Sequence, residues 1–307
     1  MTTTKLFLTA AISMAVHNSL IAQQQQTAPP AGRTQVVLLG TGRPAADPDR
    51  FGPATAIVVH GTPYLVDFGA GVVRRAAAAV RDRGISALQP ANIRIAFATH
   101  LHVDHTAGFA DLIFSAWING RSVPLEVYGP KGIKAMADHL FEAYRVDFEN
   151  RLPANRPGRS PDAHHVHTHE ITGGEVYTDD HVTVTAIPTK HGVESYGYRF
   201  DTSDRSIVIS GDTAPTQAII DACHGCDVLI HEGVALSSLE KFSPALQKAT
   251  ATGHTTTPQL AELAMKAKPR LLIVYHVGPG DAGESILREM LERYPGHVVV
   301  GRDLDVF

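Results

Sequence analysis

The chain has 307 residues and a formal net charge of −4, from 27 lysines and arginines against 31 aspartates and glutamates. Proteins that grip a nucleic-acid backbone typically carry basic stripes, and no such run occurs in this sequence. The small cluster of Arg74, Arg75, Arg81 and Arg83 is explained more simply as the solvated face of a helix. Composition therefore argues against a nucleic-acid partner.

The N-terminal segment is typical of a secretory signal peptide. Lys5 precedes a mainly apolar run over residues 6–16 that is too short to span a bilayer, and Ala22 precedes a stretch rich in Gln and Pro. We predict a signal peptide over residues 1–22, a linker over 23–33 and one large domain over 34–307. A periplasmic or secreted protein without a membrane span follows. A disordered cytosolic leader is the alternative.

Apolar runs punctuated by amphipathic segments predict an α/β domain. Strands are predicted at residues 35–39, 56–59, 64–68, 93–98, 125–128, 182–187, 197–200, 206–210, 227–231, 271–275 and 298–300. Helices are predicted at residues 71–83, 131–144, 215–222, 257–266 and 282–294. Pro215 suits the first turn of its helix, where the missing N–H costs nothing.

The most informative motif directly follows the strand predicted at residues 93–98. It reads His100-Leu101-His102-Val103-Asp104-His105 and supplies three imidazoles and one carboxylate. These are the ligand types that bind zinc or a similar divalent metal. Because one catalytic zinc needs only three protein ligands and a water, this many ligands predict two adjacent metals.

This motif and several other segments resemble the signature of the metallo-β-lactamase superfamily of metallohydrolases, in the order that the family shows. The other segments are Leu39-Gly40-Thr41-Gly42, Tyr64-Leu65-Val66-Asp67-Phe68-Gly69, Lys190-His191-Gly192-Val193, Ser210-Gly211-Asp212-Thr213 and Val274-Tyr275-His276. The resemblance implies a four-layer αββα sandwich, and it covers nearly the whole chain after residue 34.

The resemblance also implies a centre of two Zn²⁺ ions, although the same ligands tolerate Mn²⁺ or Fe. The implied ligands fall into two sets, one of His100, His102 and His191, and the other of Asp104, His105 and His276. Asp212 would bridge both metals, and Asp67 would support the site without binding metal. A hydroxide bridging the two metals would be the nucleophile.

Two further segments resemble paired motifs of the ribonuclease Z branch of this superfamily. One ends in His231-Glu232, and the other is Gly253-His254-Thr255-Thr256-Thr257, in which Thr255 to Thr257 are candidate helix N-caps. The resemblance makes His254 the general acid and Glu232 the carboxylate that orients it, with Asp104 as a third candidate catalytic residue. His231 is interpreted as a hydrogen-bonded histidine at a strand end.

Positions that bind no metal resemble the secreted arylsulfatases of the superfamily. They lie in residues 52–56, 64–69, 128–132, 191–193 and 303–307. We therefore expect an arylsulfatase-like hydrolase of small sulfate or phosphate esters, with a small anionic ester as its partner.

Two other functions remain open. The first is a ribonuclease Z-type phosphodiesterase that processes the 3′ ends of tRNA. Only residues 201–209 separate the Tyr-Gly-Tyr-Arg-Phe and Ser-Gly-Asp motifs, which leaves no room for the arm with which bacterial ribonuclease Z grips tRNA. The second is a metal-binding module without catalysis, which predicts missing ligands, and none is missing.

Three segments lie outside these motifs. Residues 145–160 are charged and Pro-rich, which predicts a surface loop that could lie over the site. Residues 164–170 place alternating histidines on an edge strand or loop, at best a weak metal patch. Cys223 and Cys226 are interpreted as two ordinary half-buried cysteines, with a local disulfide as the alternative. The oligomeric state stays open, a homodimer included.

Overall fold

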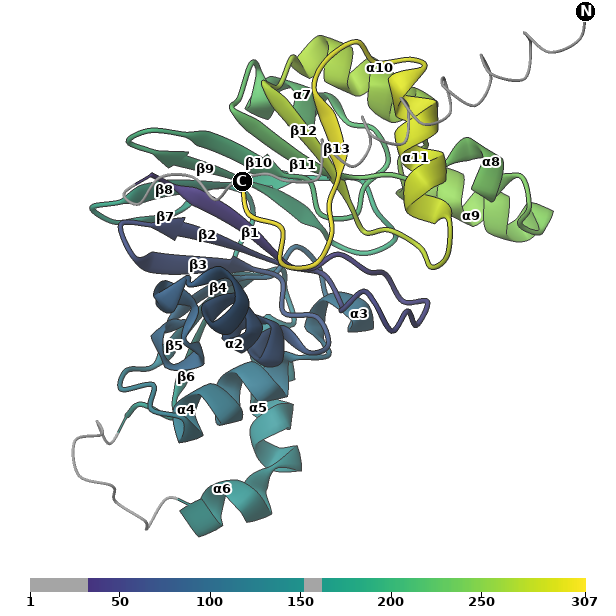
Figure 1. Cartoon of the computed structure of the whole chain (residues 1–307). Helices are drawn as coiled ribbons and strands as arrows, with labels where there is room; N and C mark the ends of the chain where they lie inside the picture. Colours follow the sequence, from purple (N-terminus) through teal and green to yellow (C-terminus); the bar gives the residue numbers. More distant parts are fainter. Residues whose placement is uncertain (1–32, 152–161) are drawn as a thin grey trace, which may run out of the picture.

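A computed structural model describes residues 33–151 and 162–307 of the chain (Figure 1). The predicted signal peptide and all of the predicted linker except Arg33 lie outside the described residues, so the division of the chain before residue 34 stays a prediction. No helix within the described ranges has the length and apolar character needed to cross a membrane.

Two β-sheets form the centre of the domain. The first sheet has the order β1-β2-β3-β4-β5-β6, and the second has the order β13-β12-β11-β10-β9-β8-β7. The strands of the first sheet are β1 Gln35–Gly40, β2 Ala54–Val59, β3 Thr62–Val66, β4 Ile95–Phe97, β5 Leu125–Gly129 and β6 Val166–Glu170. Those of the second are β7 Gly174–Thr178, β8 Val182–Pro188, β9 Tyr196–Thr202, β10 Ser206–Ile209, β11 Val228–Glu232, β12 Leu271–Tyr275 and β13 Val298–Val300.

Helices cover the outer face of each sheet (Figure 1). The α-helices are α2 Val72–Arg83, α3 Val103–Thr106, α4 Ala116–Ile118, α5 Ile133–Ala143, α6 Arg145–Arg151, α7 Gln217–Cys223, α8 Leu236–Leu239, α9 Pro244–Gly253, α10 Thr257–Ala267 and α11 Ala282–Leu291. Short 3₁₀ turns lie at Ser86–Leu88 and Pro90–Asn92, and a π-helical turn, η3, lies at Asp111–Ser115.

The hydrophobic cores show why these elements stack in four layers. Strand β1 sends Val36 and Leu38 into the core between the sheets, and Val37 into the core under the helices. Helices α2 and α5 pack on that second core, whereas α7, α10 and α11 cover a third core on the far side of the second sheet. Sheets covered on both faces need nearly continuous apolar strands. The predicted αββα sandwich is therefore confirmed.

The C-terminal end of the chain closes the domain by pairing with its first strand. The backbone N–H of Val36 donates to the carbonyl of Phe307 over 3.0 Å, and that of Phe307 donates back to Val36 over 2.9 Å. Asp303 accepts hydrogen bonds from the N–H and the hydroxyl of Thr41 and from the N–H of Phe51. The C-terminal segment thereby holds the loop that follows β1.

Several predicted boundaries differ from the structure. Helix α7 begins at Gln217, because the Thr216 side chain accepts from the N–H of Ala218 as its N-cap, so Pro215 lies before the helix. Strand β7 was not predicted, because its exposed and half-buried residues lack an apolar run. Residues 145–151 form helix α6 instead of a loop, stabilised by an Asp147–Arg151 pair one turn apart, and residues 152–161 lie outside the described ranges.

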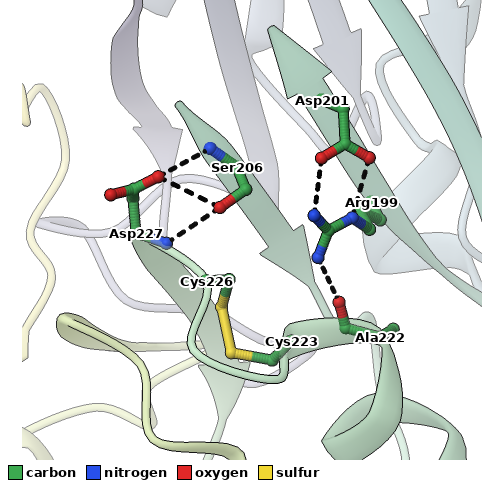
Figure 2. Close-up of a disulfide and its surroundings, with 7 residues drawn as sticks. All are labelled: Arg199, Asp201, Ser206, Ala222, Cys223, Cys226 and Asp227. Atoms are coloured by element: carbon green, nitrogen blue, oxygen red, sulfur yellow. Dashed lines mark hydrogen bonds and ion pairs between the residues drawn. A yellow bond between two sulfur atoms is a disulfide. The ribbon is translucent and has the colours of Figure 1, made fainter. Parts of the chain in front are cut away.

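The preferred interpretation of the two cysteines is wrong. Cys223 and Cys226 are joined by a disulfide, with their Cα atoms 4.7 Å apart, and both are buried (Figure 2). Between them His224 and Gly225 both have positive φ, which turns the chain back between α7 and β11. This backbone conformation brings the two sulfurs together. The residue types alone do not predict it, because a histidine such as His224 rarely adopts a positive φ. The disulfide lies at the N-terminal end of β11, whereas Glu232 lies at its other end.

Candidate metal centre

The predicted ligands meet beyond the C-terminal ends of strands from both sheets. The histidine-rich motif follows β4 and enters α3, and its ligands lie beside side chains that follow strands β8, β10 and β12. Those three strands run in the same direction, because β9 is antiparallel to both β8 and β10, and β10, β11 and β12 are parallel. Their C-terminal ends therefore lie together, as binding sites of parallel sheets commonly do.

One group of side chains surrounds the ring of His102. The Nε2 atoms of His100 and His191 lie 3.0 Å and 3.1 Å from Nδ1 of His102. Both Nε2 atoms also lie within 4.0 Å of Oδ2 of Asp212. These three histidines form a group that could hold a metal ion.

A second group lies on the other side of Asp212. Nε2 of His276 lies 3.2 Å from Oδ2 of Asp104 and 3.3 Å from Oδ2 of Asp212. Nε2 of His105 lies 3.5 Å from Oδ2 of Asp104 and 3.4 Å from Oδ1 of Asp212. Asp104, His105 and His276 also form a group that could hold a metal, and Asp212 lies between the two groups.

The hydrogen bonds of the site fit metal ions better than an empty polar core. Nδ1 of His191 donates to the carbonyl of Gly253 over 2.7 Å, which leaves Nε2 to face the centre with a lone pair. Nε2 of His105 and Oδ1 of Asp212 are buried and make no hydrogen bond within the described part of the chain. Burial without a partner is costly for a polar atom, and a divalent cation would satisfy both atoms.

The protonation states expected at most of the ligands also suit metal binding. His105 is the exception, because burial lowers its pKa but the charges of Asp212 and Asp67 outweigh burial and raise it, so a metal ion bound there would displace a proton. Burial lowers the pKa of His100, and burial likewise lowers the pKa of His191, so both rings stay neutral. Burial raises the pKa of Asp104, but the hydrogen bond from His276 and the charges of His105 and His276 together outweigh burial and lower the pKa overall. Neutral imidazoles and ionised carboxylates are the forms that bind metal. The site therefore supports a divalent metal.

Asp67 lies beneath the second group and holds it in place. Its Oδ2 accepts from Nδ1 of His105 over 2.8 Å and from the hydroxyl of Thr99 over 2.9 Å, and its Oδ1 accepts from the Thr99 N–H over 2.7 Å. Asp67 and His276 both have positive φ, a backbone conformation that concentrates at functional sites.

Replacing Asp67 with asparagine is expected to weaken metal binding by about 10- to 100-fold. The asparagine can still accept from Thr99, but its amide nitrogen cannot accept the Nδ1–H of His105. The measurement is the metal affinity in competition with a chelator, with the exposed Asp138→Asn as the matched control. Equal affinities in the two variants would show that this carboxylate does not orient the ligand.

His254 and Glu232 form a pair at the edge of the centre. Nδ1 of His254 lies 2.9 Å from Oε1 and 3.0 Å from Oε2 of Glu232, and 4.0 Å from Oδ2 of Asp212. Burial lowers the pKa of His254, but the hydrogen bond and the charge of Glu232 outweigh it and raise the pKa to about 9. His254 also belongs to groups that could hold a metal, yet its Nδ1 is already committed to Glu232.

His231, which directly precedes Glu232, is only partly hydrogen-bonded, in contrast to the prediction. Nδ1 of His231 donates to the carbonyl of Glu232 over 2.7 Å, but its buried Nε2 has no hydrogen-bond partner among the described residues. Burial lowers the pKa of His231 to about 4, so the ring is neutral. Only half of its hydrogen-bonding capacity is used.

Three residues within the quoted motifs hold the site through contacts that the sequence analysis did not predict, namely Thr213, Thr255 and Gly253. The N–H of Thr213 donates to Oε1 of Glu232 over 2.7 Å, and the carbonyl of Thr213 accepts from the hydroxyl of Thr255. The carbonyl of Gly253 orients His191. The position of Thr213 directly after Asp212 was the available signal for the first.

An α/β sandwich with two groups of metal-binding side chains around a buried aspartate, and a His–Glu pair beside them, defines the class of metal-dependent hydrolases that act on ester bonds. Residues 62–277 match the family model described as "Beta-lactamase superfamily domain", which is more than half of the chain. The chain therefore belongs to the beta-lactamase superfamily.

Known proteins narrow the relationship. The chain is 30% identical over 280 residues to a protein from Mycobacterium bovis named ribonuclease Z, covering 88% of this chain and 96% of that protein. A ribonuclease Z from Mycobacterium avium is 32% identical over 279 residues, with the same coverage. The fold is similar to the metallo-β-lactamase fold protein YhfI from Bacillus subtilis, with a TM-score of 0.67, 17% identity and coverage of 90% and 99%. It is also similar to the short form of human tRNase Z, with a TM-score of 0.66, 22% identity and coverage of 89% and 98%.

These relatives overturn two expectations. The arylsulfatase-like activity is wrong as the main interpretation, because the relatives are named ribonuclease Z, and the exclusion of nucleic acid is wrong for the same reason. The missing arm does not separate this chain from them, because an alignment of 280 residues already covers 96% of the Mycobacterium bovis protein. Net charge was a poor guide, because it sums the whole surface whereas binding depends on local potential.

Proposed function

We propose that this protein is a metal-dependent phosphodiesterase of the ribonuclease Z type, with RNA that includes precursor tRNA as its substrate. The observation that carries the proposal is the 30% sequence identity to a protein named ribonuclease Z, over an alignment that covers 88% of this chain. The His254–Glu232 pair beside Asp212 supports it, because cleavage of a phosphodiester needs an acid beside the metals. The exported location stays a prediction from the leader sequence, and it competes with this substrate, because an exported enzyme would not meet precursor tRNA.

Two Zn²⁺ ions are the proposed cofactors, because nitrogen and carboxylate donors prevail in the site. His100, His102 and His191 would hold one ion, Asp104, His105 and His276 the other, and Asp212 would contact both. When bound, such ions lower the pKa of water and neutralise charge on the phosphate oxygens.

His254 supplies the proton that the departing oxygen needs. Glu232 accepts the Nδ1–H, so the ring presents its Nε2–H to the substrate. Water adds its oxygen to phosphorus, the bond from phosphorus to the departing ribose oxygen breaks, and that oxygen takes the Nε2 proton. Glu232 stabilises the charged imidazolium before the transfer, and the N–H of Thr213 holds Glu232 in place. The proton released by the attacking water restores His254 for the next turnover.

The test compares three substrates with the zinc-loaded full chain. We expect cleavage of a precursor tRNA with a 3′ trailer, turnover of bis(4-nitrophenyl) phosphate, and no turnover of 4-nitrophenyl sulfate. Products of the RNA reaction are resolved by gel electrophoresis and end-group analysis.

A variant with Asp212 replaced by alanine, purified in the same way, shows whether a contaminating nuclease causes the cleavage. Intact RNA after incubation with active, metal-loaded enzyme would refute the proposal. Turnover of the small diester alone would then assign a phosphodiesterase with a different substrate.

A further inference from the structure

We propose that Arg43 binds the anionic phosphate of the substrate beside the metal centre and thereby sets its position and specificity. This rests on the proposed function, because it assumes a substrate that presents a phosphate oxygen. The residue lies in the loop between β1 and β2, far from every metal-binding motif in sequence.

The guanidinium of Arg43 packs on the loop that follows the ligand His276. A Cβ atom added at Gly278 would lie 2.9 Å from Cζ, Nε and Nη2 of Arg43, so a larger residue at position 278 would displace the guanidinium from its present place. On the other side, Cζ lies 5.9 Å from the centre of the Phe242 ring, which belongs to the segment between α8 and α9. The side chain therefore bridges the loop of His276 and the segment that leads to His254.

Its charge reaches the reacting groups. The carboxylates of Glu232 and Asp212 both act on the pKa of Arg43, although burial is the larger effect and lowers it. The charge of Arg43 in turn acts on the pKa of His254. Arg43 is thus a cation close enough to Glu232, Asp212 and His254 for their charges to interact.

In the part of the chain that the structure describes, the N–H donors of the Arg43 guanidinium are also unused. Within residues 33–151 and 162–307 its guanidinium makes no hydrogen bond and no salt bridge, and its side chain is half-buried. The neighbouring Arg50 differs, because its Nη1 donates to the Thr41 hydroxyl and to the Gly301 carbonyl. A half-buried guanidinium with unused donors is suited to bidentate contact with a phosphate.

The test measures binding of inorganic phosphate to the zinc-loaded protein by calorimetry, together with KM and kcat for bis(4-nitrophenyl) phosphate. We expect Arg43→Met to weaken phosphate binding and raise KM by about 10- to 100-fold, the size of a charged hydrogen-bond pair. Arg43→Lys should recover part of the loss, because lysine keeps the charge but not the planar fork. Zinc content should not change.

Two further variants show whether the position of the Arg43 guanidinium or the net charge of the protein determines phosphate binding. Arg270→Met removes an exposed arginine at the opposite end of β12 from His276, and should leave both measurements unchanged. Gly278→Ala keeps the net charge but displaces the Arg43 guanidinium, and should reproduce part of the loss.

Phosphate binding and KM within twofold of the unmodified protein for Arg43→Met would overturn the proposal. A loss equal to that of Arg270→Met would also overturn it, because it would reflect net charge alone. A protein that fails to cleave RNA while Arg43 still controls phosphate binding would refute the proposed function and leave this inference standing.

Discussion

Replacement of Asp212 with alanine is expected to lower turnover of a phosphodiester by at least about a thousand-fold. Asp212 is buried between the two groups of histidines, within 3.3–4.0 Å of ring nitrogens from both. Its removal takes away the one carboxylate that both metals would share, and metal catalysis is worth several kcal/mol, where each 1.36 kcal/mol is tenfold in rate. The measurements are kcat with bis(4-nitrophenyl) phosphate and the bound metal per chain.

The matched control is Asp221→Ala, which removes an exposed aspartate from α7. It should retain metal and activity. Circular dichroism of both variants checks the fold. We expect both to fold, because the substitution at Asp212 removes a carboxylate that lies among histidine side chains and removes no residue of the hydrophobic core. An Asp212→Ala protein with full metal content and full activity would exclude the centre described above as the site of catalysis.

Replacement of His254 with alanine is expected to lower kcat by about 100- to 10,000-fold while metal content stays unchanged. The loss should be largest for a substrate with a poor leaving group and smaller for a 4-nitrophenyl ester, whose departing oxygen needs little protonation. Comparing precursor RNA with bis(4-nitrophenyl) phosphate measures this difference. Loss of metal in the variant would instead make His254 a ligand.

The pH dependence of kcat gives an independent check on His254. An acid must be protonated to act, and Glu232 raises the pKa of His254 to about 9 against the effect of burial. Activity that depends on this proton is present below that pKa and declines as pH rises through it. In Glu232→Gln the raising effect is lost while burial remains, so the decline should begin at lower pH. The same decline in both proteins would show that another group controls it.

Local patterns predicted most of the fold because of how strands are buried. Strands of sheets that are covered on both faces need continuous apolar runs, and such runs can be recognised in the sequence. The run over residues 271–275, for example, matches β12 in full. Strand β7 lies at a sheet edge with its residues exposed or half-buried, so it leaves no such run. The histidines of β6 lie on an edge strand, one of the two alternatives considered, where His167 and His169 both contact Glu126.

The choice between sulfate and phosphodiester chemistry could not come from the ligands. Both substrates present tetrahedral anionic oxygens to the same metals, so the ligand motif carries no information on this point. Non-ligand segments favoured the arylsulfatases, and comparison with whole relatives corrected that preference.

The sequence by itself determined which residues gather at the centre. Each ligand stands in a motif that resembles the superfamily signature and follows an apolar strand, so the ligand set could be named from the sequence. The ligands themselves meet only when the two sheets pack together, because β4 lies in one sheet and β8, β10 and β12 lie in the other. Only the tertiary structure decided which ring nitrogen faces inward, that Asp67 holds His105, and that Gly278 leaves room for Arg43. Strand and helix patterns are set by neighbours in sequence, whereas these contacts join segments that meet only after the two sheets pack together.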